Sequence, residues 1–94
     1  MDSKHKKAVK LVQKRLWSWG CRVSDFTEYK NVSFDLMVDK HIRVQVVVDG
    51  QQASADGWDV LARVSEHSIT LIGRKHPALQ YSMGGAVATL FGKK

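Results

Sequence analysis

An acidic side chain and an amide side chain lie on two neighbouring segments in which apolar and polar residues alternate. Asp35 starts the first segment, Gln45 lies inside the second, and Lys40-His41 separates the two segments. If two strands bring this pair together, the carboxylate and amide oxygens could hold a hard cation such as Mg²⁺ or Mn²⁺. Water bound to the cation could then attack a phosphodiester. Asp35 and Gln45 are therefore the candidate metal ligands and catalytic residues.

A valine stands where this chemistry needs a lysine. Such a lysine, two positions after Gln45, would orient or activate the metal-bound water and offset the charge of the phosphate. The residue at that position is Val47, which can do neither. This substitution predicts that catalysis is lost unless a relocated lysine replaces the missing one.

The register of the two strands also limits the candidate pair. A two-residue turn at Lys40-His41 would pair Asp39 with Ile42, and it would place Asp35 opposite Val46 rather than Gln45. A bulge, a longer turn or a shifted register is needed to bring Asp35 and Gln45 onto one face.

Helical spacing of apolar residues predicts a helix at each end of the chain. In residues 3–19 the buried stripe is Val9, Val12, Leu16 and Trp19, and Gly20 ends the helix. Residues 77–91 predict a closing helix with Pro77 in its first turn and with Leu79, Met83, Val87 and Leu90 on one side. The Gly84-Gly85 pair in this helix indicates close packing or a kink.

A period of two predicts strands between these helices. The expected strands begin at Cys21, at Phe34 and at Ile42, and the segment 51–57 is a polar loop. Residues 58–64 and 69–73 predict a hairpin, although a helix over 58–65 fits almost as well. The predicted fold is a single α+β domain, residues 1–94, with an N-terminal helix packed on a small mixed sheet of about five strands and with a C-terminal helix.

Positive charge is concentrated near both ends of the chain. The net charge is +6; residues 1–22 carry +6, residues 23–72 carry −4 and residues 73–94 carry +4. The predicted solvent-exposed face of the first helix carries Lys4, Lys7, Lys10 and Lys14, with Trp17 at its margin. This arrangement predicts phosphate contacts with a nucleic acid.

The order of elements and three short stretches resemble the PD-(D/E)XK (restriction endonuclease-like) nuclease superfamily over roughly residues 5–73. The stretches are Trp19-Gly20-Cys21-Arg22-Val23, Phe34-Asp35-Leu36-Met37-Val38-Asp39 and Arg43-Val44-Gln45-Val46-Val47. The resemblance implies an αβββ core with Asp35 and Gln45 as metal ligands. The chain departs from the family pattern at Val47, in the absence of Glu from the first helix, and in the shortness of segment 51–57.

Three functions follow as hypotheses. The first is a DNA-binding protein with a degenerate nuclease-like core that does not cut. The second is a dimeric endonuclease that uses Mg²⁺ or Mn²⁺ and either a relocated lysine or a lysine from the partner subunit. The third is a non-enzymatic, homo-oligomeric interaction subunit. The single Cys21 predicts a reducing, cytoplasmic compartment, and no apolar run approaches the roughly 20 residues that span a membrane.

Overall fold

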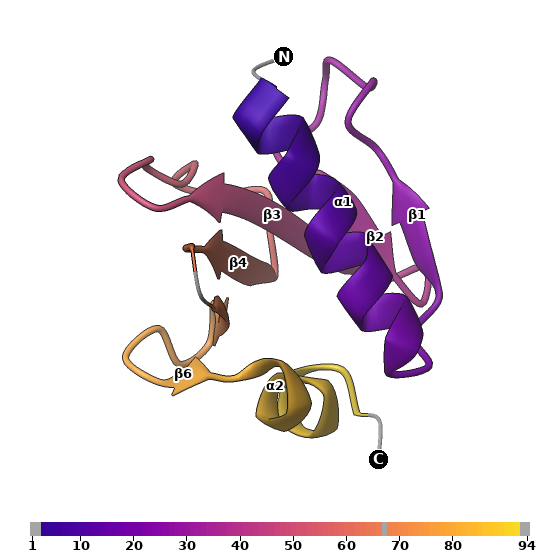
Figure 1. The fold of residues 1–94 in the computed structure, drawn as a ribbon, viewed down its shortest axis with the longest axis vertical. Helices are drawn as coiled ribbons and strands as arrows, with labels where there is room; N and C mark the ends of the chain where they lie inside the picture. Colours follow the sequence, from indigo (N-terminus) through magenta and orange to yellow (C-terminus); the bar gives the residue numbers. More distant parts are fainter. Residues whose placement is uncertain (1–2, 67, 93–94) are drawn as a thin grey trace.

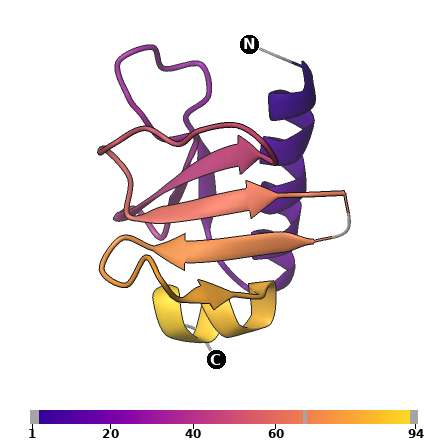
Figure 2. The same ribbon diagram turned by 90° about the vertical axis from the view of Figure 1, so that its left-hand side faces the viewer.

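The computed structural model describes residues 3–66 and 68–92, and over these residues the chain forms two helices and one six-stranded mixed sheet (Figures 1 and 2). The elements are α1 (Ser3–Ser18), β1 (Val23–Asp25), β2 (Leu36–Val38), β3 (Ile42–Val48), β4 (Val60–Val64), β5 (Ile69–Gly73), β6 (Gln80–Tyr81) and α2 (Met83–Leu90). This architecture confirms the predicted α+β class. The two-residue strand β6 brings the sheet to six strands rather than about five.

The strands lie across the sheet in chain order, and the central step is the parallel one. β3 pairs with β4 in parallel, with Val44 opposite Val60, whereas the other neighbouring strands are antiparallel. The β4–β5 pair confirms the predicted hairpin and assigns residues 60–64 to a strand instead of a helix. The connection over 49–59 contains no helix, as the polar composition of residues 51–57 predicted.

The turn between β2 and β3 is one residue longer than the sequence predicted. Val38 pairs with Ile42, so the loop contains Asp39, Lys40 and His41 rather than Lys40 and His41 alone. The φ angles of Asp39 and Lys40 are 54° and 69°, and the His41 N–H donates to the Val38 carbonyl at 3.2 Å. Two consecutive left-handed residues without glycine or asparagine are uncommon, and this is why the turn was mispredicted.

Helix α1 packs its apolar stripe onto the sheet. Val9, Val12 and Leu16 are buried as predicted, and Gln13 is buried beside them. Trp19 was expected in this stripe, but the helix ends at Ser18 and Trp19 remains 46% exposed. Gly20 then takes a φ of 87°, which allows the chain to turn towards β1.

Helix α2 begins later than predicted. Pro77 and Leu79 lie outside the helix, which starts at Met83, and Leu79 is 51% exposed. After β5 the chain turns twice. The His76 N–H donates to the Gly73 carbonyl, and the Leu79 N–H donates to the His76 carbonyl. These turns return the chain to the sheet as β6 before the helix can begin.

Both helices cover the same face of the sheet. One cluster joins buried residues of α1 and α2 to buried residues of the strands between β2 and β5. A smaller cluster on the opposite face contains Val47, Trp58, Leu61 and Ile72. Since successive strand residues face opposite sides, Val46 belongs to the first cluster and Val47 to the second.

Candidate functional site

Asp35 lies immediately before β2 and is almost fully buried. Its own N–H donates to the Val44 carbonyl at 2.9 Å, and its carbonyl accepts the Phe26 N–H at 2.8 Å. The residue is 9% exposed. The backbone on both sides of Asp35 is therefore tied to the sheet, and its carboxylate has a defined position.

The Asp35 carboxylate completes the hydrogen bonding of β3. β3 continues to Val48, but β2 begins at Leu36 opposite Val44, so the edge of β3 beyond Val44 lacks a partner strand. Asp35 Oδ2 accepts the Val46 N–H at 2.8 Å. The carboxylate thus replaces the backbone carbonyl that a longer β2 would have supplied.

His5 of α1 binds the same place from the helix side. Its Nε2 lies 3.2 Å from Asp35 Oδ2 and 3.0 Å from the Val46 carbonyl oxygen. Both of these oxygens are acceptors, so Nε2 must carry a hydrogen. His5 was missed in the sequence analysis, although it lies four residues before Val9 and therefore extends the buried stripe of the helix.

Gln45 is directed to the opposite side of β3. Its Nε2 donates to Ser54 Oγ at 3.1 Å, and its Oε1 accepts the Ser54 N–H at 2.9 Å. These two bonds anchor the connection over 49–59 on the face that also carries Val47, which is 3% exposed.

The structure therefore does not bring the two candidate metal ligands together. Asp35 is bonded to Val46 and to His5 on the α1 side, whereas Gln45 is bonded to Ser54. Within residues 3–66 and 68–92 no group of three or more His, Cys, Asp or Glu side chains is arranged to hold a metal ion. Metal binding by the pair stays a prediction.

Arg43, two residues before Gln45, is held by an acid. Its guanidinium forms two hydrogen bonds of 3.0 Å with the Asp59 carboxylate, and its backbone N–H donates a third at 2.9 Å. The hydrogen bonds from Arg43 lower the pKa of Asp59 below its usual value of 3.8, although partial burial opposes this shift. The pair links the start of β3 to the residue before β4.

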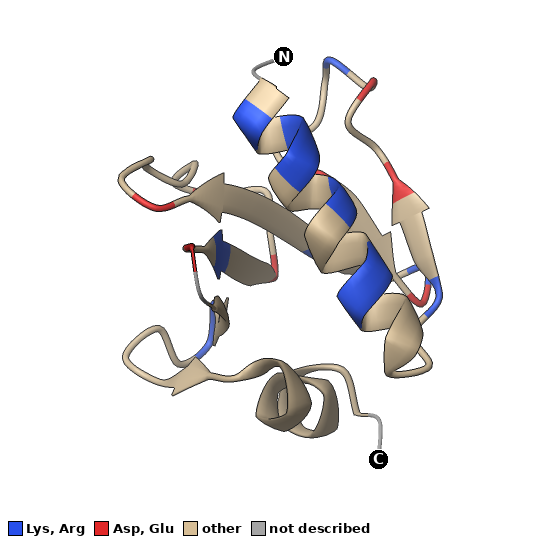
Figure 3. Ribbon diagram, in the orientation of Figure 1, with Lys and Arg blue, Asp and Glu red and all other residues tan. Residues whose placement is uncertain are grey.

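Basic residues recur along α1 from Lys4 to Arg15, and the last three residues of the helix are uncharged (Figure 3). Its sixteen residues include no Asp or Glu. The exposed lysines are Lys4, Lys6, Lys7, Lys10 and Lys14. Trp17, near the end of the helix, is 52% exposed. All the predicted nucleic-acid-binding residues are thus exposed on α1, and Lys6, which the sequence did not single out, lies among them.

Lys10 marks the side of α1 that faces β1. Its Nζ lies 3.7 Å from Asp25 Oδ2, and the lysine side chain remains 65% exposed. Burial acts to raise the pKa of Asp25, but hydrogen bonds from Thr27 and the charge of Lys10 outweigh it and lower this pKa. Lys6 and Lys14 are one turn away on either side of Lys10, and neither forms an ion pair with any residue in the described ranges.

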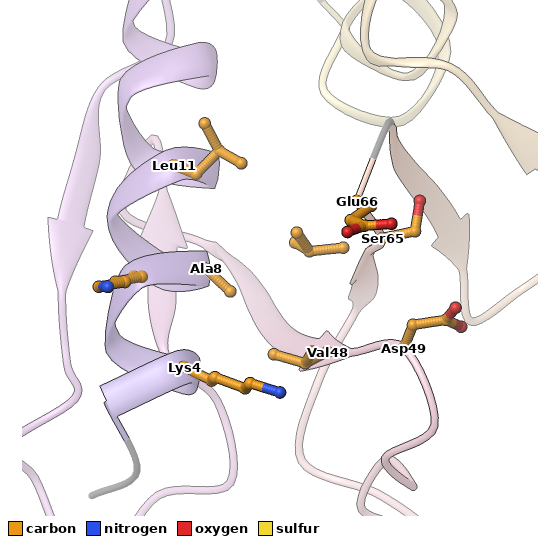
Figure 4. A pocket seen from close by; sticks show the side chains of 9 residues that line it. Lys4, Ala8, Leu11, Val48, Asp49, Ser65 and Glu66 are labelled. Carbon is orange, nitrogen blue, oxygen red and sulfur yellow. The ribbon is translucent and has the colours of Figure 1, made fainter.

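A groove of about 710 Å³ lies on the other side of α1 (Figure 4). Its apolar part includes Ala8 and Val48; Lys4 lies on the helix side, and Asp49 and Glu66 lie on the strand side. Opposite charges on the two sides do not favour a polyanion. The side of α1 towards β1, where Lys10 pairs with Asp25 but Lys6 and Lys14 pair with no acid of the described residues, is the better surface for one.

Comparisons with known proteins found no relative of this chain: no family model, no curated protein and no solved structure matches it. In the part of the chain that the structure describes, neither helix is long and apolar enough to cross a membrane.

Proposed function

We propose that this chain binds nucleic acid, with DNA preferred, through the exposed lysines of α1, and that it does not cut its ligand. The observation that carries the proposal is a sixteen-residue helix with exposed lysines along its length and no acidic residue. A lysine row of this kind can replace the counterions condensed on a phosphate backbone, and their release favours binding.

The environment of Asp35 supports the absence of catalysis. Asp35 Oδ2 already accepts hydrogen bonds from Val46 and His5, so a metal ion would have to compete with the edge of the sheet for this oxygen. Gln45 is engaged with Ser54, and Val47 is buried where the family pattern requires a lysine. In this proposal the nuclease-like core serves to bind nucleic acid and not to cut it.

The ligand contacts in this proposal are mainly to phosphates. Such contacts position a nucleic acid without reading its sequence. We therefore expect little sequence preference and a steep loss of affinity as the salt concentration rises. The homodimer and the cytoplasmic location expected from the sequence stay predictions.

The test compares two double variants that remove the same amount of charge. Lys6→Gln with Lys14→Gln neutralises the side of α1 next to β1, and Lys40→Gln with Lys75→Gln neutralises exposed lysines elsewhere. Fluorescence anisotropy with labelled single-stranded and duplex DNA, at several salt concentrations, gives the affinity and its salt dependence. For the α1 variant, the slope of log affinity against log salt should become shallower by about 0.7–0.9 for each lost contact.

The control variant should keep the wild-type slope. Equal losses in the two double variants would show that net charge, and not the surface of α1, attracts DNA. An affinity of the wild type that does not change between low and physiological salt would overturn the proposal itself.

A further inference from the structure

Three aromatic rings between β1 and β2 lead from the core to the solvent. The centroid of Phe26 lies 5.2 Å from that of Phe34 and 4.8 Å from that of Tyr29, and the rings of Phe26 and Tyr29 are tilted by 39°. Phe34 is 9% exposed, whereas Tyr29 is 61% exposed. Tyr29 therefore packs against Phe26, which packs in turn against the buried Phe34, and Tyr29 itself remains largely exposed to the solvent.

Backbone hydrogen bonds hold this support in place. The Tyr29 N–H donates to the Phe26 carbonyl at 3.0 Å, and the Phe26 N–H donates to the Asp35 carbonyl at 2.8 Å. Asp25 accepts both the N–H and the hydroxyl of Thr27, at 2.8 and 2.6 Å. The exposed ring is thus presented by a hydrogen-bonded turn, and a ligand that packs on it has little chain to order.

The aromatic segment, residues 26–34, is flanked by two acids that contact α1. Asp25, just before the segment, pairs with Lys10, and Asp35, just after it, is bonded to His5. In both views the segment lies at the same end of the molecule as the beginning of α1 (Figures 1 and 2). Lys30, next to Tyr29, is also exposed.

We propose that Tyr29 stacks against an unpaired base of a nucleic acid strand whose phosphates contact the Lys6 and Lys10 side of α1. The inference rests on the proposed function and gives it a ligand class: single-stranded or locally unpaired nucleic acid. Within a duplex the faces of a base are covered by its neighbours, so an exposed ring can stack only on a base that has left the helix. Every base has such a face, and the contact therefore requires no particular sequence.

The experiment uses three DNA probes and two variants of the full chain. The probes are a short oligothymidylate, an abasic strand of the same length and a duplex. The abasic strand carries the same phosphates as the first probe but has no bases to stack. Tyr29→Ala removes the ring, and Tyr29→Phe keeps the ring but loses the hydroxyl.

We expect the wild type and Tyr29→Phe to bind oligothymidylate more tightly than the abasic strand. Tyr29→Ala should lose roughly 5- to 150-fold in affinity for oligothymidylate, the range that stacking of one base provides. Its affinity for the abasic strand and the duplex should change by less than about twofold, with the salt slope unchanged, because its phosphate contacts remain.

The outcomes separate this inference from the function beneath it. If the wild type binds none of the probes, nucleic-acid binding fails and the stacking proposal fails with it. If the wild type binds all three probes equally and Tyr29→Ala does the same, the inference is overturned while the proposed function stands. Circular dichroism of Tyr29→Ala verifies that the variant is folded, as the exposure of the side chain leads us to expect.

Discussion

The carboxylate of Asp35 has a structural role that its sequence context does not reveal. In the sequence it is an acid at the start of a strand, in a pattern that suggests metal chemistry. In the structure it accepts the Val46 N–H and meets His5, so it joins the helix to the part of β3 that has no strand partner on its β2 side. A buried backbone donor must be satisfied, and the Asp35 side chain meets this demand for the Val46 N–H.

Replacing Asp35 should therefore affect stability. Asp35→Ala leaves the Val46 N–H without its acceptor and should lower the free energy of unfolding by about 1–3 kcal/mol. Asp35→Asn keeps an oxygen that can accept this hydrogen bond, so its loss should be smaller. Urea denaturation of the two variants measures the difference.

Adding Mn²⁺ to the same unfolding experiment tests the metal-ligand hypothesis. A cation that binds only the folded protein raises the unfolding midpoint. If Mn²⁺ stabilises the wild type but not Asp35→Asn, the metal-ligand role is supported. If Asp35→Ala unfolds at the wild-type midpoint without metal, the structural role described above is wrong.

The Arg43–Asp59 pair predicts a loss of stability in acid. Hydrogen bonds from Arg43 lower the pKa of Asp59 in the folded protein, so the unfolded chain takes up a proton at this residue first as the pH falls. The contribution of the pair is present above about pH 4 and is lost as the pH falls further, through the lowered pKa. It amounts to about 0.5 kcal/mol, because both side chains are about two-fifths exposed and solvent screens them.

Asp59→Asn is the matched variant for this measurement, since its amide oxygen can still accept the Arg43 N–H. Its unfolding free energy, followed from pH 7 downwards, should fall less steeply below about pH 4 than that of the wild type. Parallel curves for the two proteins would show that Asp59 has the same pKa in the folded and unfolded chains.

At the scale of elements, the two glycines of α2, Gly84 and Gly85, lie in different surroundings. A Cβ on Gly84 would lie 3.0 Å from the end of the Trp19 ring, whereas the nearest atom to a Cβ on Gly85 would be 3.8 Å away. Gly84 thus lets α2 approach the residue that follows α1, which confirms the predicted close packing. A Cβ at Gly85 would make only ordinary van der Waals contacts, so a glycine there only weakens the helix.

Alanine should therefore stabilise the protein at one of these positions more than at the other. Gly85→Ala should raise the free energy of unfolding by up to about 1 kcal/mol, the difference in helix propensity. Gly84→Ala gains the same propensity but must displace Trp19, so its net effect should be smaller or destabilising. Thermal unfolding ranks the two variants, and a higher midpoint for Gly84→Ala would contradict the packing described for Trp19.

Elements with strong apolar periodicity could be predicted from the sequence. The stripe Val9, Val12 and Leu16, the strand 42–48 and the hairpin after it formed as their patterns indicated. Elements set by local backbone geometry could not. Nothing in the residue types at Asp39 and Lys40 signals two left-handed residues, and the turns around Pro77 end in a strand where helical spacing continues.

The candidate site divides in the same way. The exposed lysines of α1 follow from amphipathic spacing, and all of them except Lys6 were predicted as binding residues. The partners of Asp35 and Gln45 come from segments far along the chain, His5 and Ser54, and they depend on how the elements pack. The exposed ring of Tyr29 also needed the structure, because its sequence neighbours do not show the stack beneath it.

At the scale of the whole molecule, the densest group of exposed lysines lies on one helix, α1. α1 carries its basic residues beside Asp25 on one side and beside a groove with Asp49 and Glu66 on the other (Figure 3). We therefore expect a polyanion to be attracted mainly to the strip of exposed lysines on α1. The salt titration of the two double variants measures whether that strip dominates binding.

The parallel step in the centre of the sheet also affects how the chain can fold. In the β2–β3 and β4–β5 hairpins, pairing starts at residues four or five positions apart and can zip away from the turn. In β3–β4 every pair, from Val44 with Val60 to Val48 with Val64, is separated by sixteen positions. No short turn can start the pairing of β3 with β4. The entropic cost of closing the whole connection must therefore be overcome before the first β3–β4 pair forms. The sheet thus consists of two antiparallel meanders, β1–β2–β3 and β4–β5–β6, joined by the parallel pair β3–β4. We expect the pairing of β3 with β4 to be the slowest step in folding.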